Sequence, residues 1–167
     1  MESLIEYNDY VQNTKNYLRN LERFKTTSAN KREQAEMWKA ELSIDVPIAK
    51  YSAMPGGGTG DLTSTESAAA HREKIQERIT TALKEAERLD HIVSMVERSI
   101  NLLPTEDRMI IEMRFREGRS WMQIADTLNY SEKWAAKKGN KAVKLIARML
   151  FGDIAFPGQQ ELFVFAI

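Results

Sequence analysis

Three lysines at equal spacing, Lys133, Lys137 and Lys141, lie in one basic stretch of the chain. Since an α-helix repeats about every 3.6 residues, this spacing puts the three side chains on one helical face. Ammonium groups arranged in this way can contact phosphates or guanine edges together. Asn140, beside the last lysine, carries the amide that can read adenine. The pattern therefore predicts DNA binding through charge and hydrogen bonds.

Charge is balanced over the whole chain but unevenly distributed along it. The sequence has 24 basic and 24 acidic residues, whereas residues 108–150 contain ten lysines and arginines and four acids. A local basic surplus is the electrostatic footprint of a nucleic-acid-binding surface. The alternative is that these residues form an ordinary solvated face.

Residue types that could support catalysis or bind a metal do not form a pattern. His71 and His91 are twenty residues apart and lack the spacing to carboxylates of a metal site or an acid–base pair. The absence of cysteine excludes disulfides and thiolate ligands. We therefore expect no enzymatic activity, no cofactor and no metal.

Two long helices are predicted before the basic stretch. Apolar residues recur at steps of three and four over residues 4–21, weaken through residues 25–34 and resume at 37–42, and Pro47 ends the helix near residue 45. A second segment keeps the strict 3.5-residue period of a coiled-coil seam. Its seam residues are Ile75, Ile79, Ala82, Ala86, Leu89, Val93, Val96, Ile100 and Leu103.

The segment at about 45–65 joins these helices and is rich in proline and glycine. After Gly60 it continues with Asp61-Leu62 and not with the Lys-Ser/Thr of a phosphate-binding loop, so it predicts a reversal. We expect Thr65 or Ser67 to cap the second helix. We also expect this helix to approach its partner closely at Ala82 and Ala86. The two helices should pair as an antiparallel hairpin within the chain, between chains as a homodimer, or both.

Residues 103–150 predict a helix-turn-helix. A helix begins at Thr105, with Met109, Ile110, Met113 and Phe115 on its apolar side, and ends at Gly118. Ser120 caps a short helix whose inward residues are Met122, Ile124, Ala125 and Leu128. Asn129-Tyr130 forms a turn, and Ser131 caps a third, basic helix that ends near Leu150.

This segment resembles region 4 of bacterial sigma factors and related phage regulators. The resemblance is carried by Leu103-Pro104, Arg114-Phe115, Glu117-Gly118, Ser120, Ile124-Ala125, Leu128, Ser131 and Ala142. The order of two long helices, Pro/Gly-rich loop and helix-turn-helix is similar to the ArpU/RinA-like group of phage and prophage late-gene transcription regulators. The resemblance implies an activator of phage late genes, acting in the cytoplasm of a bacterial host at the nucleoid, with double-stranded DNA and RNA polymerase as partners.

The expected DNA contacts come from the second and third helices of this segment and the loop before them. They are Arg119, Ser120, Gln123, Ser131, Glu132, Lys133, Trp134, Ala136, Lys137, Asn140 and Lys141. Trp134 is either a DNA contact or an anchor in the core. Lys138 departs from the pattern, which has an apolar residue there, so it must extend to solvent or the helix must shift. Gly139 follows in mid-helix at a cost of about 1 kcal/mol relative to alanine.

Residues 151–167 form a predicted tail with a second recognition pattern. Pro157-Gly158 separates it from the last helix. The segment that follows resembles the Gln-x-x-Leu-Phe peptides that bind the bacterial DNA polymerase sliding clamp, with Gln159, Leu162, Phe163 and Phe165 as contacts. The alternative is that these apolar side chains pack back onto the protein.

The sequence thus predicts an all-α protein with three parts: a hairpin over 1–102, a helix-turn-helix over 103–150 and an extended tail over 151–167. No apolar run is long enough to span a membrane, and the first residues lack signal-peptide order. The favoured function is sequence-specific transcription regulation, with recruitment by the sliding clamp or RNA polymerase. The alternatives are a phage protein-interaction factor without specific DNA reading and, third, a small terminase subunit.

Overall fold

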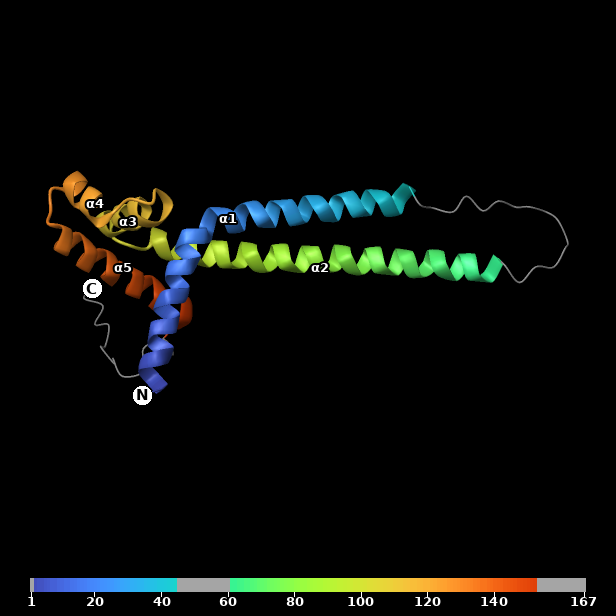
Figure 1. Cartoon of the computed structure of the whole chain (residues 1–167), viewed down its shortest axis with the longest axis horizontal. Helices are drawn as coiled ribbons and strands as arrows, with labels where there is room; N and C mark the ends of the chain where they lie inside the picture. The colour runs from blue at the N-terminus through green and yellow to red at the C-terminus, as the bar shows by residue number, and fades with distance from the viewer. Residues whose placement is uncertain (1, 45–60, 153–167) are drawn as a thin grey trace, which may run out of the picture. The chain divides into compact units, whose positions relative to one another are not determined.

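A computed structural model of the chain describes residues 2–44 and 61–152, and within these ranges it contains helices and no strand. The predicted all-α fold class is confirmed. The elements in chain order are α1 (Glu2–Ile44), α2 (Asp61–Asn101), α3 (Thr105–Ile111), the π-helical turn η1 (Glu112–Arg116), α4 (Trp121–Leu128) and α5 (Glu132–Phe151) (Figure 1).

The chain forms two compact units. Among the described residues, the hairpin unit comprises residues 24–44 and 61–91, and the bundle unit comprises residues 2–23 together with 92–152. Helices α1 and α2 each contribute residues to both units. This division by packing differs from the segments predicted at 1–102, 103–150 and 151–167, because the first half of α1 packs in the same unit as the helix-turn-helix.

In the hairpin unit, α1 and α2 lie antiparallel and side by side, as the sequence predicts (Figure 1). Ile75, Ile79, Ala82 and Ala86 of the predicted seam are buried in this unit, which removes their apolar surface from water, whereas Leu89 is half-buried. The core of this unit consists of Ala35, Ile75, Ile79 and Ala82, with Trp38, Leu42 and Leu83 packed against it. Pairing of α1 and α2 within one chain therefore buries the seam at these positions.

Small residues set the distance between the two helices. Ala82 and Ala86 are almost fully buried, and the Ser28 hydroxyl oxygen lies 3.2 Å from the carbonyl oxygen of Ala86. The expected close approach is thus confirmed. The apolar pattern of α1 weakens through residues 25–34, as expected, but the seam continues there through small residues, since Ser28 and Ala35 are buried seven residues apart.

Helix α2 also begins earlier than expected. It starts at Asp61, so Thr65 and Ser67 lie inside the helix and do not cap it. Residues 61–101 contain neither glycine nor proline, so no helix-breaking residue interrupts α2.

A polar cluster fixes the register of the hairpin. The Ser28 hydroxyl donates a 2.5 Å hydrogen bond to Asp90 Oδ1, and Arg32 forms an ion pair with the other oxygen of that carboxylate. The Ser28 hydrogen bond, followed by that of Arg32, holds the pKa of Asp90 below its ordinary value. Because a slip of one turn would leave the buried Ser28 hydroxyl without its partners, the cluster favours one alignment of α1 and α2.

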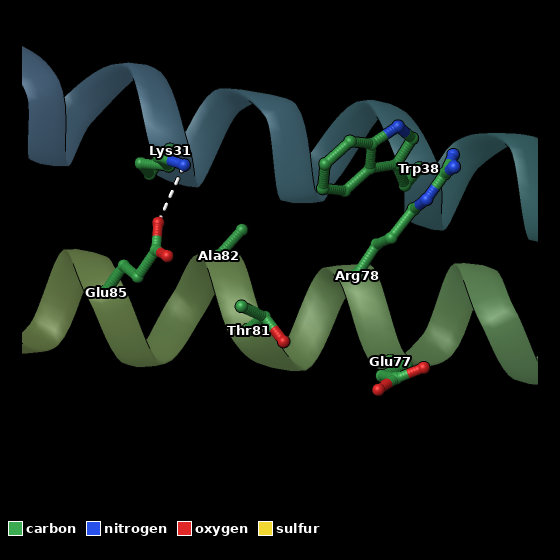
Figure 2. A pocket seen from close by; sticks show the side chains of 7 residues that line it. All are labelled: Lys31, Trp38, Glu77, Arg78, Thr81, Ala82 and Glu85. Carbon is green, nitrogen blue, oxygen red and sulfur yellow. Dashed lines mark ion pairs between the residues drawn. The ribbon is translucent and has the colours of Figure 1, made fainter.

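A groove of about 290 Å³ runs along the hairpin close to this cluster. Figure 2 shows the Lys31–Glu85 ion pair, 2.7 Å long, at one end and Arg78 extending beside the Trp38 indole at the other. Both partners of the ion pair are well exposed, so it contributes little to stability. The alignment therefore depends more on the buried serine and the seam than on surface charges.

The bundle unit joins the first half of α1 to the C-terminal helices. The Phe151 ring of α5 lies 5.0 Å from that of Tyr10 and 6.3 Å from that of Tyr17, measured between centroids. Arg116 of η1 pairs with Glu22 of α1 at 3.1 Å. Its buried apolar residues come from every helix of the unit: Leu18, Leu21, Val93, Val96, Ile100, Leu103, Ile110, Ile111, Met113, Ile124, Ala125, Ala135, Ala142, Val143, Ile146 and Ala147.

We expect Asp90→Asn to lower the free energy of unfolding by about 1 kcal/mol near neutral pH, since a half-exposed charged acceptor is lost. The folded-state pKa of Asp90 lies below the unfolded value. Its stabilising contribution is therefore present above the ordinary aspartate pKa of about 4 and is lost as pH falls through the folded value. Urea unfolding at neutral and acidic pH should show the difference between wild type and variant shrinking on acidification.

Glu87→Gln provides the matched control, because Glu87 is an exposed carboxylate on the same helix. It should change stability little at either pH. An Asp90→Asn difference that stays constant down to acidic pH would contradict the role assigned to the ionised Asp90.

Candidate nucleic-acid interface

The helix-turn-helix is built from local capping interactions that the sequence predicts. Gly118 ends η1 with a positive φ of 71°, as expected of a residue without Cβ. Ser120 and Gln123 form a capping box at the start of α4, with reciprocal hydrogen bonds of 3.2 and 2.9 Å. Ser131 caps α5 by accepting a 3.3 Å hydrogen bond from the Trp134 amide. The predicted helix starts at 105, 120 and 131 are thus confirmed within one residue.

The turn between α4 and α5 depends on one left-handed residue. Asn129 has a φ of 56°, and the Tyr130 amide donates a 3.0 Å hydrogen bond to the carbonyl of Ala125. These are the features of a Schellman motif, in which asparagine tolerates the left-handed conformation. The turn therefore has a fixed backbone geometry.

Beneath the turn, α3, η1, α4 and α5 share one apolar cluster. It contains Ile110, Met113, Ile124, Ala125 and Ala135, with Trp121, Leu128 and Trp134 packed against it. Ala125 is the small residue that the close crossing of the helices requires, as predicted.

Two methionines expected in this core face outward instead. Met109 is 43% exposed and Met122 is 59% exposed. The buried stripe of α3 contains Ile110 and Ile111, and that of α4 follows residues 121, 124, 125 and 128, so each methionine lies off the stripe. Ile111 and Trp121 occupy the core positions that were predicted for Met109 and Met122.

The predicted lysines lie together on the exposed face of α5. Lys133, Lys137, Asn140 and Lys141 are all exposed, and they fall within an arc of about 100° around the helix. We call this face the lysine stripe. Lys144 lies on the same arc but was not among the predicted contacts. Its position three residues after Lys141 and seven after Lys137 would have placed it on this face. The stripe extends about 16 Å along the helix axis.

The predicted contacts that precede the stripe have structural partners. Arg119 pairs with Glu117 at 2.6 Å, and its guanidinium donates a 3.2 Å hydrogen bond to the Thr127 hydroxyl. Ser120 and Gln123 are exposed, but their side chains form the capping box. These residues hold α4 in place whether or not they contact DNA.

The remaining predicted contacts lie at the first turn of α5. Ser131 and Glu132 are exposed, and Ala136 is half-buried. Ser131 is committed to the cap of the helix. Glu132, as an acid in the first turn, also suits the positive end of the helix dipole.

Trp134 is anchored in the protein. It is half-buried, packs against the apolar cluster, and stacks on Tyr130 with ring centroids 3.7 Å apart and an interplanar angle of 23°. Of the two roles open at the sequence level, this geometry favours the anchor. The exposed partner in the stack is Tyr130, which the sequence predicts only as part of a turn.

Lys138 is accommodated by acids on α3. Its ammonium group pairs with Glu106 and lies 3.6 Å from Asp107 and 4.8 Å from the ring centroid of Trp134. Of the two accommodations predicted for Lys138, the side chain extends and the helix is not shortened. Burial raises the pKa of Asp107, and nearby Lys141 opposes that rise. Lys138 therefore joins α5 to α3 and is not part of the lysine stripe.

Gly139 has a packing role that the sequence did not reveal. A Cβ at this position would lie 2.5 Å from Cη2 and 2.7 Å from Cζ3 of Trp121, and 3.1 Å from Cγ2 of Ile110. The indole of Trp121 thus packs directly on the α5 backbone. Arg114 lies over the outer part of the same indole, 4.8 Å from the centroid, and its guanidinium donates a 2.6 Å hydrogen bond to the carbonyl of Arg119.

The described part of the chain gives little support for a metal site or a membrane-spanning helix. His71 and His91 are exposed, and residues 2–44 and 61–152 contain no group of three His, Cys, Asp or Glu that could hold a metal ion. Within the same ranges, no helix combines the length and apolar character needed to cross a membrane. The predicted clamp-binding residues Gln159, Leu162, Phe163 and Phe165 lie outside the described residues.

Comparison with known families gives one match. The family model described as Protein of unknown function (DUF722) matches residues 58–148, a range that covers α2 through most of α5. No curated protein and no solved structure matches the chain.

The packing at Gly139 predicts that Gly139→Ala destabilises the protein by about 2 kcal/mol, since the added methyl overpacks against the indole. Helix propensity alone predicts the opposite, a gain of up to about 1 kcal/mol. Chemical denaturation would measure the sign. Asn140→Ala, at the next and exposed position, is the control and should be neutral or slightly stabilising. A Gly139→Ala protein at least as stable as wild type would refute the close packing.

Proposed function

The chain belongs to the family Protein of unknown function (DUF722), and we propose that it is a transcription regulator that places α5 in the major groove of double-stranded DNA. The observation that carries this proposal is the lysine stripe, presented on a helix that two caps and a shared core hold rigidly against α4. A helix-turn-helix uses its second helix in this way, with the first helix crossing the backbone.

The charge distribution supports DNA as the partner. Residues 131–148 carry six basic side chains and one acid, although the chain as a whole is neutral. Lys138 is engaged with the acids of α3, so the charges of Lys133, Lys137 and Lys141 are the ones directed outward along the predicted face. Phosphate contacts from such a row supply affinity that depends steeply on salt.

Regulation of transcription is the part of the proposal that derives from the resemblance to sigma region 4 and to the ArpU/RinA-like group. The alternative, a protein-interaction factor with a helix-turn-helix scaffold, uses the same fold but needs no affinity for DNA. DNA binding therefore separates the two, and its salt dependence tests the assigned surface.

We expect the variant Lys133→Ala/Lys137→Ala/Lys141→Ala to bind duplex DNA more weakly than wild type. The slope of log affinity against log salt concentration should fall by about 2 to 3, since each lost phosphate contact contributes about 0.9. Fluorescence anisotropy with a labelled duplex, repeated across salt concentrations, measures both quantities. Alanine is a good helix former, so thermal stability should be retained.

The charge-matched control is Lys39→Ala/Lys74→Ala/Lys84→Ala, which removes three exposed lysines from the hairpin unit. It should leave both affinity and salt slope unchanged. Equal losses in the two triple variants would show that net charge, and not the stripe, determines binding. A wild-type protein without affinity for any duplex would favour the interaction factor.

A further inference from the structure

An exposed aromatic residue lies at the entrance to α5 and has no role in the DNA contacts described so far. Tyr130 is 47% exposed although its ring stacks on Trp134 at 3.7 Å. We call this pair the aromatic step. A large ring left half in water beside a basic surface is a candidate for contact with whatever that surface binds.

The aromatic step is rigid on both sides. The backbone of Tyr130 is held by the left-handed Asn129 and by its hydrogen bond to the carbonyl of Ala125. Trp134 is held by the cap of α5 and by the apolar cluster behind it. Because both rings are already immobilised, contact with a ligand would cost little side-chain entropy.

The aromatic step borders the lysine stripe. Trp134 lies about 20° from Lys141 and about 60° from Lys137 around the helix, and Tyr130 precedes the first turn. In helix-turn-helix proteins the N-terminal residues of the second helix contact base edges. With α5 placed as proposed, the ring of Tyr130 would therefore face the major-groove floor.

The chemistry of that floor selects the target of an aromatic ring. Among the four bases, thymine alone presents a methyl group there, at C5, beside the hydrogen-bond donors and acceptors of the base edges. We propose that Tyr130 is a specificity-determining residue that reads a thymine methyl through its ring. This inference rests on the proposed DNA binding and deepens it, since it names a base that the site must contain.

Replacement of thymine by uracil tests the proposal directly, because it removes the methyl and keeps the base pair and every hydrogen-bonding group. The wild-type full-length chain first enriches a duplex from a randomised library. The probe is this duplex, synthesised once with thymine and once with uracil. Wild type should bind the uracil duplex about fourfold more weakly for each methyl contacted, the value of one buried methyl group. Single replacements along the duplex should place the effect at one thymine in each site.

Two variants assign the effect to the ring. Tyr130→Ala should bind both duplexes equally, at about the affinity of wild type for the uracil duplex. Tyr130→Phe keeps the ring and should retain the preference for thymine. The charge variant of the lysine stripe should weaken binding to both duplexes by the same factor and keep their ratio.

Several outcomes would overturn the inference. Equal binding of both duplexes by wild type would show that no methyl is read, even if Tyr130→Ala failed to fold. A preference retained in Tyr130→Ala would assign the methyl to another residue, and a preference lost in Tyr130→Phe would assign the discrimination to the hydroxyl and not to the ring. If the wild-type chain enriched no duplex from the library, the proposed DNA binding itself would be contradicted.

Discussion

The contact between the Trp121 indole and the backbone of Gly139 determines how the helix-turn-helix is assembled. Without a Cβ at position 139, the first residue of α4 lies directly on the middle of α5, and Ile110 of α3 reaches the same point. Three helices thereby meet at one buried position. Their contact fixes which side of α5 is buried, and so it also fixes which side carries the exposed lysines.

The electrostatics of α5 follow from that orientation. Lys138, next to Gly139, is directed toward Glu106 and Asp107 on α3, where it pairs with acids and lies near the Trp134 ring. Lys133, Lys137 and Lys141 are exposed, and Lys141 lies near enough to Asp107 to oppose the rise in its pKa. On this basic helix, Lys138 thus joins α5 to α3, whereas Lys133, Lys137 and Lys141 are exposed. A partner that is a polyanion matches such a row over its whole length.

In both units, small or polar residues at buried positions set the geometry, and large apolar residues fill the space. Ala82, Ala86 and Ser28 determine how closely α1 approaches α2, and Asp90 makes one alignment of the pair preferable. Ala125 and Gly139 have the corresponding role around α5. Ile75, Ile79 and Ala82 of α2 share one core with Ala35 of α1, so packing within the chain buries this part of the seam.

The sequence by itself determined the all-α fold, the caps of α4 and α5, and the common face of Lys133, Lys137 and Lys141. These features depend on local periodicity and on side chains that bond to nearby backbone, such as Ser120 and Ser131, and such interactions can be read over a few residues. Tertiary structure decided what depends on distant residues meeting. It showed that the first half of α1 packs in the unit of the helix-turn-helix and that Met109 and Met122 face outward. It also showed that Lys138 pairs with α3, that Gly139 receives Trp121 and that Tyr130 stacks on Trp134. In the amino-acid sequence alone, a glycine in mid-helix and a lysine at an apolar position look unfavourable. The residues that they contact lie on other helices, so only the tertiary structure explains them.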